Sequence, residues 1–480
     1  MKEKADPIRL IFGLKLKQFR QERGWSLQEL SDRCDISPSY LNEIEKGKKY
    51  PKTDKIFELS RALGVEYDEL VSSDLKKALG PTGEILKNKF FTDIPFEFFG
   101  IDPARIIEMI ADAPVKFSAL VNTLIKIGRS YNVSVEKLYF AVLRSYLEIH
   151  KNYFPELEEL AETFLKGEEK TESVLKKYLR VEHQLATDTF DGEKYPALAG
   201  LRTVLVPRSK KFFLNRNLTE KQRIFALARE SGFRFMGIRV RPLTSTWVSV
   251  NSFDEVFNNF KASYFAACIL IPKNSLIREM QKVLGDHKFS RRKFLNVLDQ
   301  FPVSEETVFY RLFSLLPAHF QIEKLYFLKF TSSDGSRAPR LIKEIHLVGQ
   351  HDPQENRNEH YCRRWPGISI LDEVPFNSDE RFIKTQISNF ETMGHRYFEV
   401  ALAKTSKDGG TESITLGMEI DSNVRSKVAF MDDTGITRKE VGQTCERCAL
   451  FECKDRVAAP TILHQQRKLN EVNRAIEGLR

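Results

Sequence analysis

Three cysteines stand within nine residues near the end of the chain, in the stretch TCERCALFECKDR (444–456). Two residues separate Cys445 from Cys448, and Cys453 follows after four more. Thiolates at this spacing are typical ligands of zinc or of an iron–sulfur cluster. Because such centres usually take four protein ligands, the pattern raises the question of where a fourth thiolate lies.

The chain has six cysteines, so three candidates remain for the fourth ligand. Cys34 lies in an N-terminal helical segment, and Cys268 lies in the apolar stretch FAACILIP, which is typical of a core helix. Cys362 in EHYCRRWPG is left. The predicted metal ligands are therefore Cys362, Cys445, Cys448 and Cys453, with ordinary reduced thiols as the alternative.

A second signature lies near the N-terminus, in GWSLQELSDRCDISPSYLNEIEKGKKYPK (24–52). Ser26 and Ser37 are predicted to cap two successive helices. Leu41 and Ile44 then face the core, so the opposite face of the second helix is polar. This is helix-turn-helix geometry, in which the start of the second helix faces base edges in the major groove of double-stranded DNA.

The residues expected to contact DNA follow from this geometry. Asparagine and glutamate suit the edges of adenine and cytosine, and lysines suit phosphates. The predicted contacts are Ser37, Ser39, Tyr40, Asn42, Glu43, Lys46, Lys48 and Lys49. The blocks SLQELS, SPSYLNEIEKG and LSRALGV stand in the order of the XRE (Cro/repressor-like) family, which this segment resembles. A helical bundle used for protein contacts is the alternative.

The middle of the chain resembles a zinc peptidase domain that has lost its metal ligands. The segments RIFALARESGFRFMG and NNFKASYFAACILIP are similar to two helices of an ImmA/IrrE-type domain. That family carries an H-E-x-x-H helix and a later carboxylate, which together hold zinc. The corresponding positions here are Arg229, Phe233 and Lys261, and only Glu230 is retained. We therefore expect no enzyme activity of this kind.

The order of the modules resembles the short-chain fatty acyl transcriptional regulators over nearly the full length. The resemblance implies a transcription factor whose middle domain senses an acyl-coenzyme A, with Arg229, Glu230 and Lys261 in the ligand site. The basic stretches VPRSKKFFLNRNLTEKQR and RFMGIRVRP suit the phosphate groups of coenzyme A. A solvated basic face is the alternative for these stretches, and a simple staple between two helices is the alternative for the three site residues. The family also has a lone cysteine near Cys362 and is associated with a [4Fe–4S] cluster, which favours the cluster over zinc.

The overall composition agrees with an anionic partner. The 480 residues carry a formal net charge of +9, and the pI is about 9.0, which favours nucleic acid or phosphorylated ligands. No apolar stretch approaches the ~20 residues needed to cross a bilayer. The N-terminus shows no pattern of a cleavable leader. We therefore expect a cytoplasmic protein with reduced thiols and no membrane partner.

These sites must be positioned by a mainly α-helical chain with an α+β C-terminal part. The expected units are a five-helix DNA-binding domain (8–73), a helical linker that transmits the ligand signal (74–174), a degenerate, zincin-like ImmA/IrrE domain (175–330) and a β-rich domain with the cysteine site (331–480). RTVLVPR, KFFLNR and KVAFMDD are predicted strands, and HQQRKLNEVNRAIEGLR is a predicted amphipathic helix. Paired half-sites in DNA make a homodimer the expected state.

Three functions compete on these observations. The first is a DNA-binding regulator gated by an acyl-CoA-type ligand, which would account for the N-terminal module, the middle domain and the cysteine site together. A redox- or iron-sensing regulator would use the cysteine site as its switch and leave the middle pocket vestigial. A metallopeptidase that cleaves a repressor lacks its histidines, and the sequence holds no G-x-S-x-G elbow, P-loop or G-x-G-x-x-G motif for another chemistry.

Overall fold

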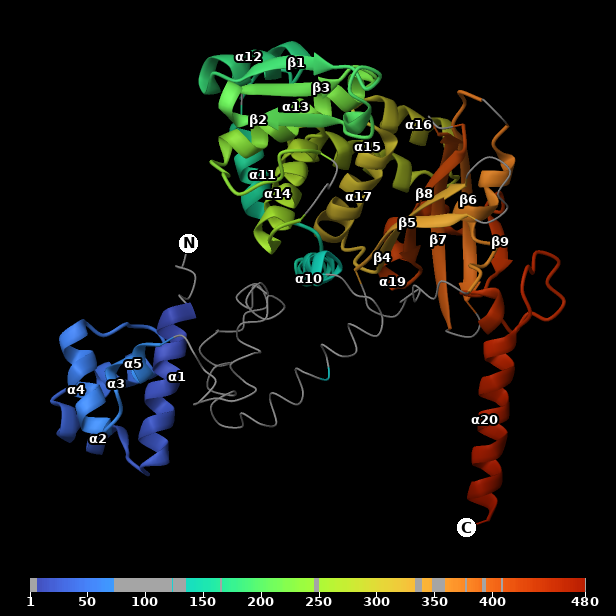
Figure 1. Cartoon of the computed structure of the whole chain (residues 1–480). Coiled ribbons are helices and arrows are strands. Elements are labelled where there is room, and N and C mark those ends of the chain that lie inside the picture. Colours follow the sequence, from blue (N-terminus) through green and yellow to red (C-terminus); the bar gives the residue numbers. More distant parts are fainter. Residues whose placement is uncertain are drawn as a thin grey trace. The chain divides into compact units, whose positions relative to one another are not determined.

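The computed structural model describes residues 7–72, 123, 135–164, 166–245, 250–332, 339–347, 359–375, 378–390, 394–406 and 409–479. The chain divides into two compact units, residues 1–146 with 250–256 and residues 147–249 with 257–480. Figure 1 shows their elements in chain order by colour. The part of the predicted linker between residues 74 and 134, apart from residue 123, lies outside the described residues.

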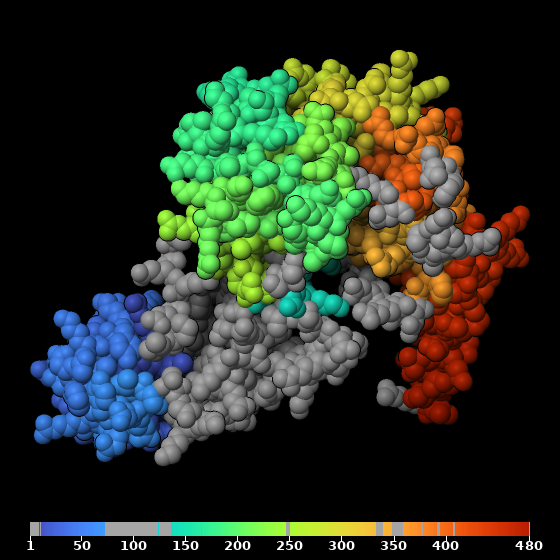
Figure 2. Space-filling model, turned by 45° about the horizontal axis from the view of Figure 1, so that its top comes forward, coloured from blue at the N-terminus to red at the C-terminus, as the bar shows by residue number. Residues whose placement is uncertain are grey.

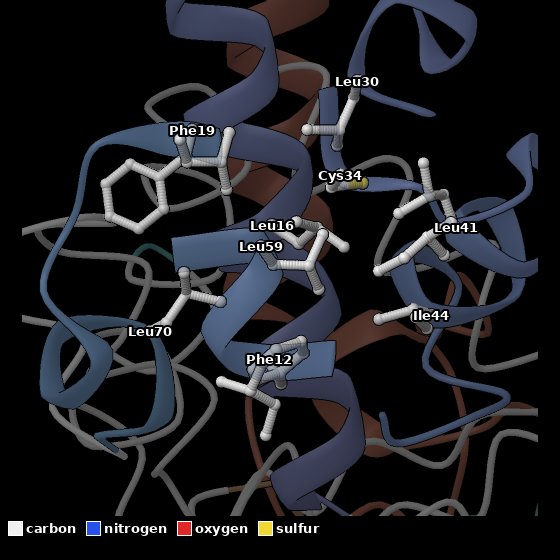
Figure 3. Close-up of a cluster of buried hydrophobic side chains, with 12 residues drawn as sticks. Phe12, Leu16, Phe19, Leu30, Cys34, Leu41, Ile44, Leu59 and Leu70 are labelled. Atoms are coloured by element: carbon white, nitrogen blue, oxygen red, sulfur yellow. The ribbon is translucent and has the colours of Figure 1, made fainter. Parts of the chain in front are cut away.

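The first unit holds the five predicted N-terminal helices. They are α1 (Pro7–Glu22), α2 (Leu27–Cys34), α3 (Pro38–Glu45), α4 (Thr53–Leu63) and α5 (Tyr67–Val71). Figure 3 shows how apolar side chains from these helices meet in one core. Leu16, Leu30 and Leu41 are completely buried in it. Removal of this apolar surface from water is the main force that holds the short helices together.

Both predicted serine caps are present. Ser26 Oγ accepts a hydrogen bond from the Glu29 backbone N–H, and the Glu29 side chain accepts one from the Ser26 N–H, which forms a capping box. Ser37 Oγ accepts from the Tyr40 N–H and starts α3. Between the two helices, Asp35 adopts a left-handed conformation with φ of 50°, which ends α2.

The second unit begins with a three-stranded sheet in the order β1-β3-β2. Strand β1 (Ala186–Phe190) runs parallel to β3 (Lys211–Asn215), and β2 (Thr203–Val206) runs antiparallel to β3. The strands predicted in RTVLVPR and KFFLNR are confirmed, whereas β1 was not predicted. The helices that lie wholly in this unit before the second sheet are α11 (Pro155–Thr163), α12 (Glu172–His183), α13 (Glu220–Phe235), α15 (Lys273–Gly285), α16 (Arg291–Asp299) and α17 (Glu305–Phe320). Most of α10 (Val135–Ile149) belongs to the first unit, and α14 (Phe253–Leu270) begins in the first unit and continues in the second.

A six-stranded sheet in the order β5-β4-β8-β7-β6-β9 forms the β-rich part. Its strands are β4 (Leu325–Ser332), β5 (Arg340–His346), β6 (Phe382–Phe390), β7 (His395–Thr405), β8 (Thr411–Glu419) and β9 (Thr437–Glu440). Neighbouring strands are antiparallel except β6 and β9, which are parallel. Helix α18 (Pro366–Ser369) packs on the sheet: a Cβ at Gly367 would stand 2.3 Å from Thr415 Oγ1 of β8.

One predicted strand is wrong. KVAFMDD does not join the sheet, and its residues Ala429–Asp432 form a 3-10 turn after helix α19 (Ser422–Lys427). The turn buries both Phe430 and Met431. In a strand, these two consecutive side chains would point to opposite faces of the sheet. Asp433 then holds the turn, since its carboxylate accepts from the backbone N–H groups of Phe289 and Gly435.

The predicted C-terminal amphipathic helix is confirmed as α20 (Thr461–Gly478). In the space-filling view it forms a red ridge that extends from the sheets and helices of the second unit (Figure 2). None of its residues is buried. Within the part of the chain that the structure describes, no helix is long and apolar enough to cross a membrane.

Candidate DNA interface and ligand sites

Helix α3 presents the predicted DNA contacts on the side that its own core leaves open. Leu41 and Ile44 are fully buried. The predicted contacts divide into the exposed residues Ser37, Ser39, Lys48 and Lys49 and the half-exposed residues Tyr40, Asn42, Glu43 and Lys46. All eight therefore lie at the accessible side of α3, at its cap or in the turn that follows it.

Two of these predicted contacts pair with each other. Lys49 Nζ lies 2.8 Å from the Glu43 carboxylate and 5.5 Å from the centre of the Tyr40 ring. The hydrogen bond from Lys49 lowers the pKa of the Glu43 carboxyl below its ordinary value. Exposed ion pairs of this kind contribute little to stability. This ion pair can therefore open at little cost, so that Lys49 binds a phosphate and Glu43 contacts a base edge.

Helix α1 holds the far end of α3 through two features that the sequence did not reveal. Arg20 donates from Nε and Nη2 to the Glu45 carboxylate at 2.6 and 2.9 Å, and from Nη1 to the Trp25 carbonyl at 2.6 Å. Gly13 allows the two backbones to approach closely, because a Cβ there would stand 2.2 Å from the Ile44 carbonyl oxygen. These contacts fix the orientation of α3, the helix that carries the predicted DNA contacts, on a rigid support.

The second predicted site lies on α13 and α14. Helix α13 is capped by Thr219, whose hydroxyl accepts a hydrogen bond from the Gln222 N–H. Gly232 brings α13 close to α14, since a Cβ there would stand 2.8 Å from the Phe265 ring. One turn earlier, Arg229 Nη1 lies 3.4 Å from Asn259 Oδ1 of α14. The two helices that resemble the peptidase pair therefore do pack together.

Arg229 is a half-buried cation among other cations. Burial is the largest effect and the charge of Arg241 the next, and together with Arg202 they lower the pKa of Arg229 to about 10. Among the described residues, no carboxylate oxygen lies within 4.0 Å of the Arg229 guanidinium. A desolvated cation without a carboxylate partner favours an anionic ligand.

Glu230 and Lys261 do not form the simple staple that was considered above. The Glu230 carboxylate is buried and accepts from Arg234 Nε at 3.0 Å and from Arg241 Nη2. The Arg241 guanidinium lies 3.7 Å above the centre of the Phe233 ring. The Lys261 ammonium lies 4.3 Å from the centre of the Phe257 ring. Glu230 is thus neutralised by two arginines outside the predicted site.

Further cations reach the same region from distant parts of the sequence. Arg202 acts electrostatically on both Arg229 and Glu306, so it lies near each of them. Glu306 also accepts from Lys329 Nζ at 2.9 Å and lies 3.8 Å from Lys343 Nζ. We call Arg202, Arg229, Arg241, Lys329 and Lys343 the cationic cluster. Sequence reasoning singled out Arg229 and, within RFMGIRVRP, Arg241, but missed Arg202, Lys329 and Lys343, which stand just before β2, on β4 and on β5.

The cysteine site joins two segments that are far apart in the sequence. Tyr361 and Thr444 form an isolated antiparallel bridge. The Cys362 N–H donates to the Gln443 carbonyl at 3.0 Å, and the Cys445 N–H donates to the His360 carbonyl at 2.8 Å. The predicted fourth cysteine therefore lies beside the C-terminal group, as expected.

Three of the four thiols are buried at this junction. Cys362, Cys445 and Cys448 are 6, 6 and 8% exposed, and Cys453 is half-exposed. Burial raises the pKa of Cys362 to about 11, although the backbone N–H groups of Arg364 and Gly442 point to its sulfur and lower it. Cys448 and Cys445 also raise this pKa through their charges, which places them near Cys362.

Buried arginine contacts hold the C-terminal loop around these cysteines. Arg456 donates to the carbonyls of Cys445 and Cys448 at 2.7 and 3.1 Å. Arg447 Nη2 donates to Glu359 at 2.7 Å and ties the loop to the Cys362 segment. Backbone N–H groups at a sulfur and cations around it are suited to a thiolate centre.

The thiols are nevertheless not gathered at one point. In the described ranges, no group of three or more His, Cys, Asp or Glu side chains stands in a geometry that could hold a metal ion. The two segments are adjacent through their backbones, so a shared centre requires rotation of the cysteine side chains toward each other.

Comparison with known proteins identifies the DNA-reading module. A helix-turn-helix family profile matches residues 16–70. The chain is 22% identical to the HTH-type transcriptional regulator RamB of Mycobacterium tuberculosis, over 92% of this chain and 93% of that protein. Control protein C.BamHI of Bacillus amyloliquefaciens is 37% identical over 65 residues, which cover 13% of this chain and 80% of that protein. This chain is therefore a DNA-binding transcriptional regulator that acts on double-stranded DNA.

Two further likenesses are more limited. The propionyl-CoA carboxylase regulator of Cereibacter sphaeroides is 24% identical over 131 residues, which cover 27% of this chain and 26% of that protein. Among solved structures, a Mycobacterium tuberculosis transcriptional regulator covers 66% of this chain and 93% of its own, at 17% identity and a TM-score of 0.47.

Proposed function

We propose that this DNA-binding regulator is gated by an anionic small molecule of the acyl-coenzyme A type, bound at the cationic cluster. Arg229 carries this proposal, because it is desolvated beside Arg202 and Arg241 and has no carboxylate partner among the described residues. A phosphate group would relieve the repulsion among these cations and form charge-assisted hydrogen bonds. One relative is named for the regulation of propionyl-CoA carboxylase, which agrees with a ligand of this class.

Gating requires that the ligand bind one conformation of the chain better than another. The predicted linker, residues 74–174, joins the DNA-reading helices to the region of the cationic cluster in sequence and is the proposed transmitter. An effector that raises or lowers operator affinity tenfold must differ in its affinity for the two states by about 1.4 kcal/mol. One or two additional ion pairs to phosphate are sufficient for that difference.

Calorimetric titration with acetyl-, propionyl- and longer acyl-CoAs tests the ligand. Arg229→Met should weaken binding of the responsive ligand at least tenfold. The matched control is Arg425→Met, since Arg425 is exposed, pairs with Asp432 at 3.9 Å and lies outside both the cluster and the basic stretches. Silence across the whole series at millimolar ligand, or equal loss in both variants, contradicts the proposal.

We also propose that Cys362, Cys445, Cys448 and Cys453 hold one metal centre, a [4Fe–4S] cluster in preference to zinc. The support is the backbone bridge that places Cys362 beside the C-terminal group, together with the N–H groups at its sulfur. When bound, such a centre would add to the folding free energy by linking the two segments. If the centre itself were the switch, the protein would instead sense redox state or iron.

Anaerobic purification with an absorption spectrum and metal analysis tests the centre. Cys362→Ser and Cys448→Ser should lose the metal or bind it weakly. Cys34→Ser and Cys268→Ser are the controls, because both thiols are buried among helices, Cys34 in the other compact unit and Cys268 in α14. Metal-free protein from anaerobic cells, or equal metal content in all four variants, contradicts the proposal. An operator-binding assay with and without the metal then separates a structural role from a sensing role.

We infer that peptidase chemistry is absent from the middle domain. Phe233 and Lys261 cannot bind zinc, and the retained Glu230 is ion-paired with Arg234 and Arg241, so it is not placed to act as a base. Chelator-sensitive cleavage of any substrate by the purified chain would overturn this inference.

A further inference from the structure

Helix α20 carries an apolar stripe that the described part of its own chain does not cover. Leu469, Val472, Ile476 and Leu479 are 61, 47, 51 and 88% exposed. Exposed apolar residues scattered singly are ordinary, but these four recur at intervals of three and four. With Ile462 and Gln465 they occupy the a and d positions of a heptad repeat.

The chain already covers another side of the same helix. Phe451, in the cysteine loop, lies with its ring 6.1 Å from that of His464 and 5.0 Å from the Arg467 guanidinium. At 100° per residue, these two α20 residues lie roughly 140° around the helix from the middle of the stripe. The cysteine loop therefore positions α20 with its apolar stripe turned away from the contact that holds it.

We propose that this stripe is a docking surface for α20 of a second copy of the chain, in a parallel and in-register pair. The register follows from Gln465, the one polar residue of the stripe. In a parallel pair, Gln465 faces its own copy, and the two amides satisfy each other. In the antiparallel pair centred on the stripe, Gln465 would face Ile476 and lose its hydrogen bonds.

The flanking residues permit this arrangement. In the parallel pair, Lys468 at position g faces Asn473 at position e of the copy. No like charges are brought together across the seam. Two of the three a positions, Ile462 and Ile476, are β-branched, and Leu479 stands at d; β-branched residues at a with leucine at d favour two-stranded coiled coils.

The two paired α20 helices are short, which limits the affinity of the dimer. The exposed apolar surface of the stripe amounts to roughly half of the ~800 Å² that each partner contributes to a standard interface. The dimer should therefore be reversible and form at micromolar concentrations. Two half-sites on DNA would then favour the dimer by binding both copies at once.

Sedimentation velocity on the full chain over ~1–100 μM tests the proposal. The wild-type chain should shift from monomer to dimer mass. Leu469→Gln with Ile476→Gln should stay monomeric throughout. The matched control is Asn470→Gln with Glu477→Gln, on the polar face, and should dimerise like the wild type. Circular dichroism checks that all variants keep their helix content.

Cysteine cross-linking tests the register. Val472→Cys at position d should give a disulfide-linked dimer under mild oxidation, above the background of the wild-type chain. Asn470→Cys should not. A monomeric wild-type chain, or a dimer that survives both seam substitutions, overturns the proposal and leaves the stripe to a membrane surface or another protein. Because the mass measurement needs no DNA, failure here does not affect the proposed regulatory function.

Discussion

The conversion of Glu399 to glutamine should change the pH dependence of folding stability. Glu399 lies on β7 in the centre of the six-stranded sheet and is 1% exposed. Its carboxyl oxygens accept from the hydroxyls of Tyr326 and Ser388. Burial outweighs these hydrogen bonds and raises the pKa of Glu399 to about 7.

The magnitude follows from the linkage between protonation and folding. The pKa of about 7 in the folded chain exceeds the ordinary value of 4.5, so the folded state holds a proton that the unfolded state has released. This contribution is fully present below pH 4.5 and is lost as the pH rises through 7. The difference of about 2.5 units, at ~1.4 kcal/mol per unit, corresponds to roughly 3 kcal/mol.

Calorimetric melting between pH 4.5 and 8 measures the effect. Glu399→Gln should remove the fall in stability across this window, so that its melting temperature exceeds that of the wild type by roughly 6–12 °C at pH 8 and not at pH 4.5. Glu412→Gln is the control, because Glu412 lies on the neighbouring strand β8 and pairs with two lysines, Lys329 and Lys404. An equal pH slope in wild type and Glu399→Gln would refute the reasoning.

Three further predictions concern the supports of the two units. Glu45→Ala leaves Arg20 without its bidentate partner; we expect a loss of about 3 kcal/mol in the first unit and weaker operator binding, measured by melting and gel shift. Gly417→Ala places a Cβ 2.2 Å from the Tyr326 ring, so the sheet should lose at least ~1–3 kcal/mol in a denaturant titration. Ser26→Ala removes the cap of α2 and should lower the unfolding free energy by ~1 kcal/mol, whereas equal stability would show that the capping box adds nothing.

Local patterns in the sequence were sufficient to predict those structural elements that depend only on neighbouring residues. Helix caps at Ser26 and Ser37 were predicted correctly, because a cap depends on residues within one turn. The C-terminal helix and strands β2 and β3 were also predicted, since their apolar residues recur at helical or alternating spacing. The approach of Cys362 to the C-terminal cysteines was expected as well.

Only the tertiary structure decided which distant charges meet. Arg202 and Lys343 resemble ordinary surface residues in the sequence, yet the fold brings Arg202 near Arg229 and Lys343 to 3.8 Å from Glu306. The KVAFMDD segment has the composition of a strand but forms a turn, in which the consecutive residues Phe430 and Met431 are both buried. Composition and periodicity are properties of short segments, whereas burial and charge pairing depend on residues far away in the chain.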